Sequence, residues 1–380
     1  MTASWGNDTA LLFDRGCLQR PGGFREGRVR CRAMNDKDQR PRLKIAIVAP
    51  PWYPIPPPAY GGIESLCHLL VEGLVERGHE VTLVGVDHPQ TSARYISTYD
   101  RAQGERIGQS FPEVVHAAAE ARSLEGLDID LVHDNSLAGP LLAFNRSIPT
   151  VVTAHGPVDG EIGEYYRLLG SHVSMVAISN AQRRMAPDLP WVETIYNAID
   201  VDDYPFRTDK EDFLLWLGRT NPDKGAHLAI DIARDIGERI VLAGKCTEPE
   251  EQRYFEEKIA PRLGTGVEWT GEADSERKKE LLSQTKCLLF PLQWPEPFGI
   301  VMAEAMACGT PVVALNEGSV PEVVENGVTG FVCDEIEAMP DALDEAVEID
   351  PHACRKRVEA LFNTSIMVSE YESVFARTVA

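Results

Sequence analysis

The chain has 380 residues, a length that predicts two domains, and its hydrophobic content of 43% is sufficient to build buried cores. Proteins that bind nucleic acid or an anionic membrane depend on clustered cations. The formal net charge of −22 argues against such a surface, so we expect neither nucleic-acid binding nor stable association with an anionic membrane. No apolar run reaches the roughly 18 to 20 residues that span a bilayer, and no secretory signal pattern is present. We therefore expect a soluble, cytoplasmic, globular protein.

Residues 1–42 differ in composition from the rest of the chain. They are rich in Arg, Gly and Asp and lack hydrophobic periodicity, and ten Lys or Arg face five Asp or Glu through Lys44. Such a composition is typical of a segment without fixed structure. Met34 is a candidate for the true initiator, in which case residues 1–33 are not translated.

From residue 43 onward, short apolar runs alternate with helical patterns. This rhythm predicts βαβ units, and therefore a mostly parallel sheet covered by helices. The strands predicted in the first half of the chain are 44–49, 81–86, 130–133, 150–154 and 175–179.

The exit of the first strand carries a pair of glycines. A proline-rich loop, residues 50–58, is followed by Gly61 and Gly62, and a helix is expected to begin near Ile63. Paired glycines let the backbone approach an anion closely, and the helix N-terminus adds a favourable dipole. The spacing differs from G-x-G-x-x-G, which removes the main support for a dinucleotide-dependent oxidoreductase. The loop itself is either a wall of a second substrate pocket or a stiff connector.

The strand pattern breaks at residues 200–210 and then restarts. The strands predicted in the second half are 213–217, 240–243, 267–270, 287–291, 312–315 and 331–333. The restart predicts a second Rossmann-like domain, followed by a last helix at residues 364–379.

Arg219 and Lys224 follow the first strand of this second domain, five residues apart. Charged side chains in a loop are usually solvated, but open α/β sheets bind ligands at the carboxyl ends of their strands. Arg supplies a planar fork of donors and Lys a compact charge, so together they can neutralise a diphosphate.

Glu296 and Glu304 bracket a turn and the start of an Ala-rich helix near Gly299. A glycine at a helix N-terminus leaves free amides and the positive end of the dipole open to an anion. Carboxylates beside such a site accept hydrogen bonds from alcohols. Phosphate and vicinal hydroxyls occur together in a sugar nucleotide, which is the ligand that this pattern predicts.

The stretch 294–334 closely resembles the donor site of the retaining GT-B glycosyltransferases, in the large family that contains sucrose-phosphate synthases and bacterial mannosyltransferases, glycosyltransferase family four. The resemblance implies that Glu296 contacts the donor sugar and Glu304 the ribose. It also implies that main-chain amides around Phe298, Gly299 and Ile300 bind the sugar and phosphate.

Other parts of the chain extend the resemblance to nearly everything after residue 43. Arg219 and Lys224 match the family's phosphate-binding cations, and Gly61 and Gly62 match a glycine loop that approaches the donor pyrophosphate. His155 resembles the family's acceptor-side histidine, which implies a role in orienting the sugar or acceptor. His133 corresponds more loosely and is a secondary candidate.

The implied fold class is α/β, of GT-B type, with two Rossmann-like domains whose parallel sheets face each other across a cleft. After the leader, 1–42, the domains are expected at 43–205, on the acceptor side, and at 206–362, which binds the nucleotide sugar. Residues 363–380 form a helix that crosses back to the first domain.

The implied reaction transfers a sugar from a nucleoside-diphosphate sugar with retention of anomeric configuration. UDP-glucose is the default donor and GDP-mannose the next candidate, and the acceptor is a small molecule or glycan. The 45–205 segment holds no lysine, which favours a soluble acceptor. The alternatives are a GT-B sugar-nucleotide epimerase and a noncatalytic sugar-nucleotide-binding protein.

Neither a metal nor another cofactor is expected. Two D-x-D sequences, 128–130 and 200–202, lie at a strand start and in the predicted linker, so surface carboxylates are the better interpretation. The cysteines show no C-x-x-C pairing, which disfavours a zinc site or a disulfide framework and favours reduced thiols. They are Cys17, Cys31, Cys67, Cys246, Cys287, Cys308, Cys333 and Cys354.

Overall fold

The protein is described by a computed structural model that covers residues 42–87 and 89–380. The expectations for the leader therefore lie outside the described residues, apart from Arg42. The described residues belong to one compact unit. The predicted domain limits at 205 and 362 stay predictions.

The first sheet has seven parallel strands in the order β3-β2-β1-β4-β5-β6-β7. Chain order reverses between β1 and β4, which pair in parallel from Ile45 and Leu131. The strands are β1 (Lys44–Val48), β2 (Glu80–Gly85), β3 (Arg94–Ser97), β4 (Leu131–Asp134), β5 (Thr150–Ala154), β6 (Ser174–Ala177) and β7 (Trp191–Thr194).

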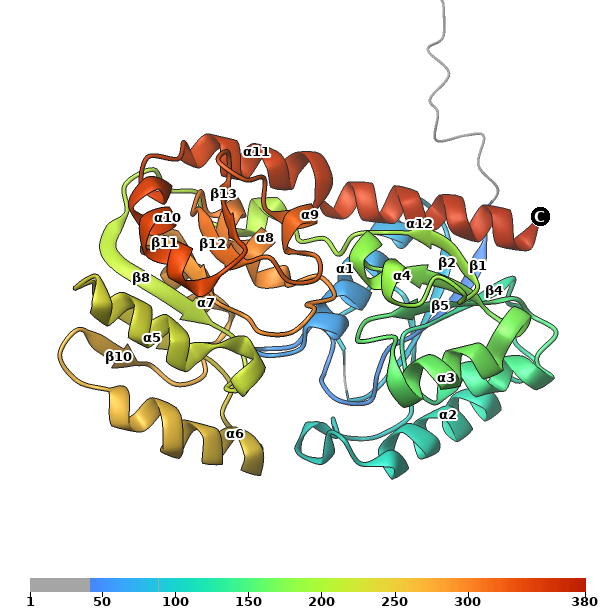
Figure 1. Cartoon of the computed structure of the whole chain (residues 1–380). Helices are drawn as coiled ribbons and strands as arrows, with labels where there is room; N and C mark the ends of the chain where they lie inside the picture. The colour runs from blue at the N-terminus through green and yellow to red at the C-terminus, as the bar shows by residue number, and fades with distance from the viewer. Residues whose placement is uncertain (1–41, 88) are drawn as a thin grey trace, which may run out of the picture. The chain divides into compact units, whose positions relative to one another are not determined.

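The second sheet has six parallel strands in the order β10-β9-β8-β11-β12-β13. Its reversal lies between β8 and β11, so both sheets repeat the doubly wound pattern. The strands are β8 (Glu211–Leu217), β9 (Ile240–Ala243), β10 (Val267–Trp269), β11 (Thr285–Phe290), β12 (Val312–Leu315) and β13 (Gly330–Cys333). Two Rossmann-like domains are thus confirmed (Figure 1).

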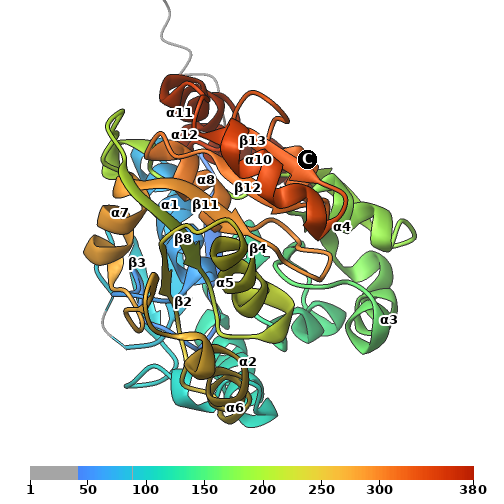
Figure 2. The same ribbon diagram turned by 60° about the vertical axis from the view of Figure 1, so that its left-hand side comes forward.

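Helices cover both faces of each sheet, as the continuous apolar runs of parallel strands require. Their bounds are α1 (Gly62–Glu76), α2 (Ser110–Leu124), α3 (Gly160–Leu169), α4 (Asn180–Met185), α5 (Ala226–Asp235), α6 (Pro249–Tyr254), α7 (Ser275–Gln284), α8 (Ile300–Ala307), α9 (Val320–Val323), α10 (Met339–Ala346), α11 (Pro351–Leu361) and α12 (Thr364–Val379). In the second domain α7, α8 and α11 pack on one face, and α5 and α10 pack on the other (Figure 2).

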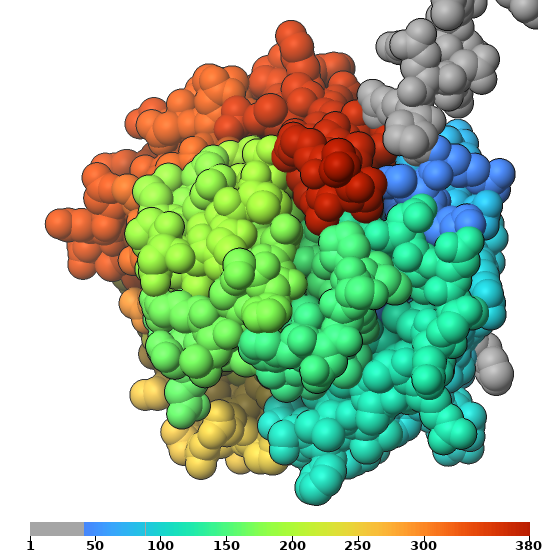
Figure 3. All heavy atoms as spheres, turned by 90° about the vertical axis from the view of Figure 1, so that its right-hand side faces the viewer, coloured from blue at the N-terminus to red at the C-terminus, as the bar shows by residue number. Residues whose placement is uncertain are grey.

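The last helix, α12, packs on the first domain although it follows the second in sequence. Its Val368 and Phe375 belong to the same buried cluster as Ile45 and Leu70, and Arg77, which follows α1, donates to Glu372 at 2.9 Å. Figure 3 shows the end of α12, in red, against blue, teal and green atoms of the first domain. The last helix of the chain is therefore part of the core of the first domain.

Two strands were missed by the sequence analysis, β3 and β7. Each has four residues, is partly exposed along its length, and forms an outer edge of the first sheet. An edge strand faces solvent on one side, so its sequence lacks the continuous apolar run that marks a central parallel strand. Among the described residues, no helix combines the length and apolar character needed to span a membrane.

Candidate active site

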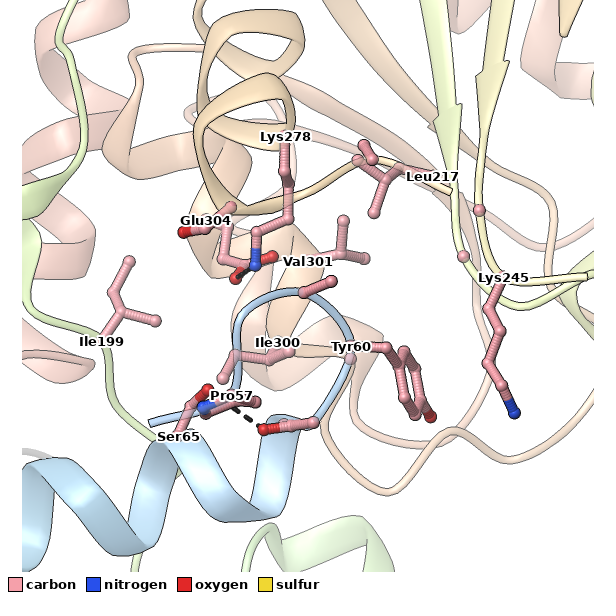
Figure 4. Close-up of a pocket in the computed structure, with 18 of the residues that line it drawn as sticks. Pro57, Tyr60, Ser65, Ile199, Leu217, Lys245, Lys278, Ile300, Val301 and Glu304 are labelled. Atoms are coloured by element: carbon pink, nitrogen blue, oxygen red, sulfur yellow. Dashed lines mark hydrogen bonds and ion pairs between the residues drawn. The ribbon is translucent and has the colours of Figure 1, made fainter. Parts of the chain in front are cut away.

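A cavity of about 400 Å³ lies at the carboxyl ends of the strands, lined by residues from both domains (Figure 4). The segments that follow β8 and β11, at the reversal of the second sheet, supply much of its wall. The predicted site residues that line it are Gly61, Gly62, Arg219, Lys224, Glu296, Gly299, Ile300 and Glu304. In Figure 4, Tyr60 and Lys245 lie at one end, and Glu304 and Ile199 lie at the other.

Glycine makes the start of α8 accessible. Gly299 has a φ of 70°, the left-handed region, and a Cβ built on it would lie 2.6 Å from Met302 Cε. In the chain from 42 to 380, residue 88 apart, the amides of Gly299, Ile300 and Val301 donate to no protein acceptor. These amides are therefore available to an anion at the positive end of the helix dipole.

The side chain of Glu296 is buried and fixed by two donors. Lys224 Nζ forms an ion pair with Glu296 Oε2, and Trp294 Nε1 donates to the same oxygen at 3.0 Å. Within the described residues no group donates to Oε1. The Glu296 carbonyl accepts from Ser319 N at 2.9 Å, which anchors the turn. One carboxylate oxygen is thus free for a ligand.

Arg219 is oriented by the N-terminal turn of α6. Its Nε donates to Glu251 Oε1 at 2.8 Å and its terminal nitrogen to Glu248 Oε2 at 3.0 Å. Glu251 also accepts from the amide of Thr247 at 3.0 Å, and Glu248 from Lys245 Nζ at 2.7 Å. Glu248 and Glu251 therefore fix the orientation of the Arg219 guanidinium, which lines the cavity.

Glu304 is held at the other end of the cavity. Its Oε1 accepts from Tyr204 OH at 2.8 Å and from Lys278 Nζ at 2.5 Å, while no described residue donates to Oε2. Figure 4 shows the Lys278 side chain reaching this carboxylate. Both predicted glutamates thus present one occupied and one open oxygen.

The floor of the cavity is peptide backbone where β8 and β9 end. Gly218 and Gly244 both line the cavity. A Cβ on Gly244 would lie 1.8 Å from the carbonyl oxygen of Gly218, so no larger residue fits there. From the first domain, Gly61 and Gly62 line the opposite wall, and the Gly61 carbonyl accepts from Ser65 Oγ at 3.0 Å.

Two predicted site residues do not line the cavity, Phe298 and His155. The Phe298 side chain is buried against Tyr196 and Phe362, and the expected role of its main-chain amide stays a prediction. His155 Nε2 is bonded to Asn135 Oδ1 at 2.9 Å, and burial lowers the pKa of His155 to about 4. Its role stays a prediction.

The polar cavity residues that the sequence analysis missed include Tyr204, Lys245 and Lys278. Lys245 follows β9 and could have been found with the strand-end rule that identified Arg219. Tyr204 lies in the segment between the sheets, and Lys278 lies in α7. For these two, no local pattern signals contact with Glu304.

No group of three or more His, Cys, Asp or Glu side chains that could hold a metal is present in residues 42–87 and 89–380. Asp128 and Asp202 of the two D-x-D sequences have highly exposed side chains, at 83% and 101%, whereas Asp200 of the second sequence lines the cavity. The expectation that no metal is needed stays a prediction. The six described cysteines are free, and the sequence prediction that they form no disulfide holds for them.

Two Rossmann-like domains closing on one cavity at their strand ends define the GT-B class of glycosyltransferases. Residues 60–203 match the family model "Glycosyltransferase Family 4", and residues 202–360 match "Glycosyl transferases group 1". The chain therefore belongs to this glycosyltransferase family, which confirms the family resemblance.

Individual relatives agree with this assignment. Glycogen synthase of Mycobacterium tuberculosis is 26% identical over 363 residues, covering 80% of this chain and 86% of the relative. AviGT4, a glycosyltransferase involved in avilamycin A biosynthesis, is 27% identical with a TM-score of 0.67, covering 89% of this chain and 98% of that one. The UDP-glucose complex of Anabaena HepE has a TM-score of 0.70 at 18% identity, covering 88% and 100%, a likeness of fold alone.

Proposed function

We propose that the protein transfers a hexose from a nucleoside-diphosphate sugar to a soluble small-molecule or glycan acceptor, with retention of configuration and without a metal. The observation that carries the proposal is the meeting of Arg219, Lys224, the open amides at Gly299 and two half-open carboxylates in one cavity. This set suits the charges and hydroxyls of a sugar nucleotide.

The difficult step is departure of the charged diphosphate. Arg219, Lys224 and the amide end of α8 line the same cavity, so a diphosphate placed among them would meet all three kinds of donor. In the structure Lys224 is paired with Glu296. A phosphate competes with Glu296 for this ammonium, and the preset donors then stabilise the leaving group at little reorganisation cost.

The two glutamates select the hydroxyl-bearing parts of the donor. Glu296 Oε1 and Glu304 Oε2 are open, and a carboxylate oxygen accepts strong hydrogen bonds from alcohols. We assign Glu296 to the sugar and Glu304 to the ribose. Their separate anchors, Lys224 with Trp294 and Tyr204 with Lys278, keep the two subsites independent.

Retention is proposed to follow from attack on the same face, assisted by the leaving phosphate. A retaining glycosidase instead uses two carboxylates about 5 Å apart, one of them a nucleophile. Glu296 is held by two donors on one oxygen and is assigned to sugar hydroxyls, so it is not our candidate for a covalent intermediate. Domain closure would exclude water and limit hydrolysis of the donor.

UDP-glucose is the proposed donor and GDP-mannose the second choice. HepE, a protein of the same fold, was solved with UDP-glucose. A soluble acceptor is proposed because the segment from 45 to 205 contains no lysine, which disfavours an anionic lipid surface.

The test is release of nucleoside diphosphate by the purified protein from UDP-glucose, GDP-mannose and related donors, with and without a panel of acceptors. We expect acceptor-dependent release, lost in Glu296→Ala, and product of unchanged anomeric configuration by NMR. An epimerase would convert the sugar without an acceptor. Donor binding without turnover, unchanged by Glu296→Ala, would identify a noncatalytic binding protein and contradict the proposal.

A further inference from the structure

Trp294 lies outside the cavity lining and still contacts two groups that line it. It belongs to the segment between β11 and α8, half-buried against the core of the second domain. Its Nε1 donates to Glu296 Oε2 at 3.0 Å, and Lys224 Nζ lies 4.6 Å from the centroid of its ring. One side chain thus touches both the carboxylate and the ammonium of the proposed site.

These two contacts act at different stages of donor binding. Glu296 Oε2 accepts from both Lys224 Nζ and Trp294 Nε1. When a diphosphate replaces Glu296 as the partner of the ammonium, the indole N–H remains on Oε2 and keeps Oε1 directed into the cavity. The ring face attracts the ammonium throughout, because a cation is stabilised over the negative face of an aromatic ring.

We propose that Trp294 is a positioning residue that fixes the positions of Glu296 and Lys224 relative to each other, so that sugar and phosphate contacts are made together. Its N–H acts on the sugar through Glu296, and its ring acts on the phosphate through Lys224. The inference rests on the proposed function and deepens it, since it adds a residue outside the cavity to the determinants of donor binding.

The two contacts can be separated by substitution. Trp294→Phe keeps a ring face for Lys224 and removes the N–H, whereas Trp294→Leu removes both. UDP lacks the sugar, so its affinity reports the phosphate contacts alone, and the ratio of UDP-glucose to UDP affinity reports the sugar contact.

For Trp294→Phe we expect UDP affinity within about twofold of the original protein, and loss of about tenfold in kcat and in the affinity ratio, the size of one hydrogen bond to a charged group. For Trp294→Leu we expect the same loss together with about threefold to fivefold weaker UDP binding, the size of a partly exposed cation–π contact. Thermal unfolding should show both variants folded.

A matched control is Trp191→Phe, which removes an indole N–H bonded to the Ala186 carbonyl at 2.7 Å in the first domain, and should change neither affinity. Equal behaviour of Trp294→Phe and the original protein overturns the inference. A parallel loss of UDP affinity and turnover in Trp294→Phe also overturns it, since general damage explains that result. Failure of the proposed function appears differently, as no turnover by the original protein, and the two affinities still test both contacts.

Discussion

The cavity wall of the second domain differs from the interior of the first domain in how polar side chains are paired. On the side of the second domain, Arg219 and Lys224 stay partly exposed, at 31% and 19%, each opposite a carboxylate. In the first domain, His133 and Glu120 are buried, and each has a buried atom without a described hydrogen-bond partner. Burial lowers the pKa of His133 to about 3, so His133 favours its neutral form, and burial also raises the pKa of Glu120, whose Oε1 accepts from Arg146 at 2.5 Å.

This difference indicates which polar groups can exchange a protein partner for a ligand. A paired, accessible charge can trade a carboxylate for a phosphate. A buried neutral group holds the fold and gains nothing from a ligand that it cannot reach. The following variants test this division, from the largest expected effect to the smallest.

Arg219→Ala should lower kcat of sugar transfer by about 10²- to 10³-fold, the range seen when one preset donor to a developing negative charge is removed. Release of nucleoside diphosphate measures it. Arg253→Ala is the matched control, because Arg253 is 65% exposed and, among the described residues, forms an ion pair with Glu250 alone, at 3.9 Å. A loss of kcat below about threefold in Arg219→Ala would show that the leaving group binds away from Arg219. That result would contradict the proposed difference between the two regions.

His133→Gln should change the pH dependence of stability. The folded pKa of His133 is about 3, below its ordinary value of 6.5, so its contribution is present above pH 6.5 and is lost as the pH falls, because the unfolded chain takes up the proton first. Between about pH 6.5 and 4.5 the original protein should lose roughly 2 to 3 kcal/mol relative to the variant.

Urea unfolding at several pH values measures this difference. His352→Gln is the control, since the His352 side chain is 70% exposed beside Asp350. A pH-independent difference between His133→Gln and the original protein would show that His133 takes up its proton in the folded state.

Gly299→Ala should raise the KM for the donor by about tenfold, because a left-handed residue with a Cβ costs roughly 1 to 2 kcal/mol and crowds the α8 amides. Gly78→Ala is the control, with a φ of 95° and no atom within 4 Å of its built Cβ, so it shares the strain without touching the site. Equal donor KM values in the two variants would show that the α8 amides do not bind the donor.

His155→Gln should have the smallest effect, a rise of about twofold to tenfold in the KM for the acceptor, the size of one hydrogen bond. The donor KM should stay unchanged, because His155 does not line the cavity that holds the proposed donor groups. Steady-state kinetics with each substrate varied in turn measure both values. A change confined to the donor KM would refute the acceptor-side role.

The sequence predicted the central strands and the meeting of distant segments because both follow from local rules. Buried parallel strands such as β1 and β8 carry continuous apolar runs, and the groups after β8 and β11 converge because strand ends at a reversal are neighbours. For α12, the apolar pattern also predicted the helix bounds, Thr364–Val379.

The partners of the site charges could not be predicted. Glu251 meets Arg219, and Tyr204 meets Glu304, 100 residues away, through packing that no sequence period encodes. The edge strand β3 could not be predicted for a different reason. It is partly exposed, so its sequence lacks a continuous apolar run.

The glycine floor at Gly218 and Gly244 has a practical consequence for engineering substrate range. A library randomised at Gly244 would consist mainly of misfolded members, since the Gly218 carbonyl oxygen would lie 1.8 Å from any Cβ at that position. The α1 face that presents Ser65, His68 and Leu69 to the cavity is the better target. Recoding these three positions alters the wall while the peptide floor stays intact.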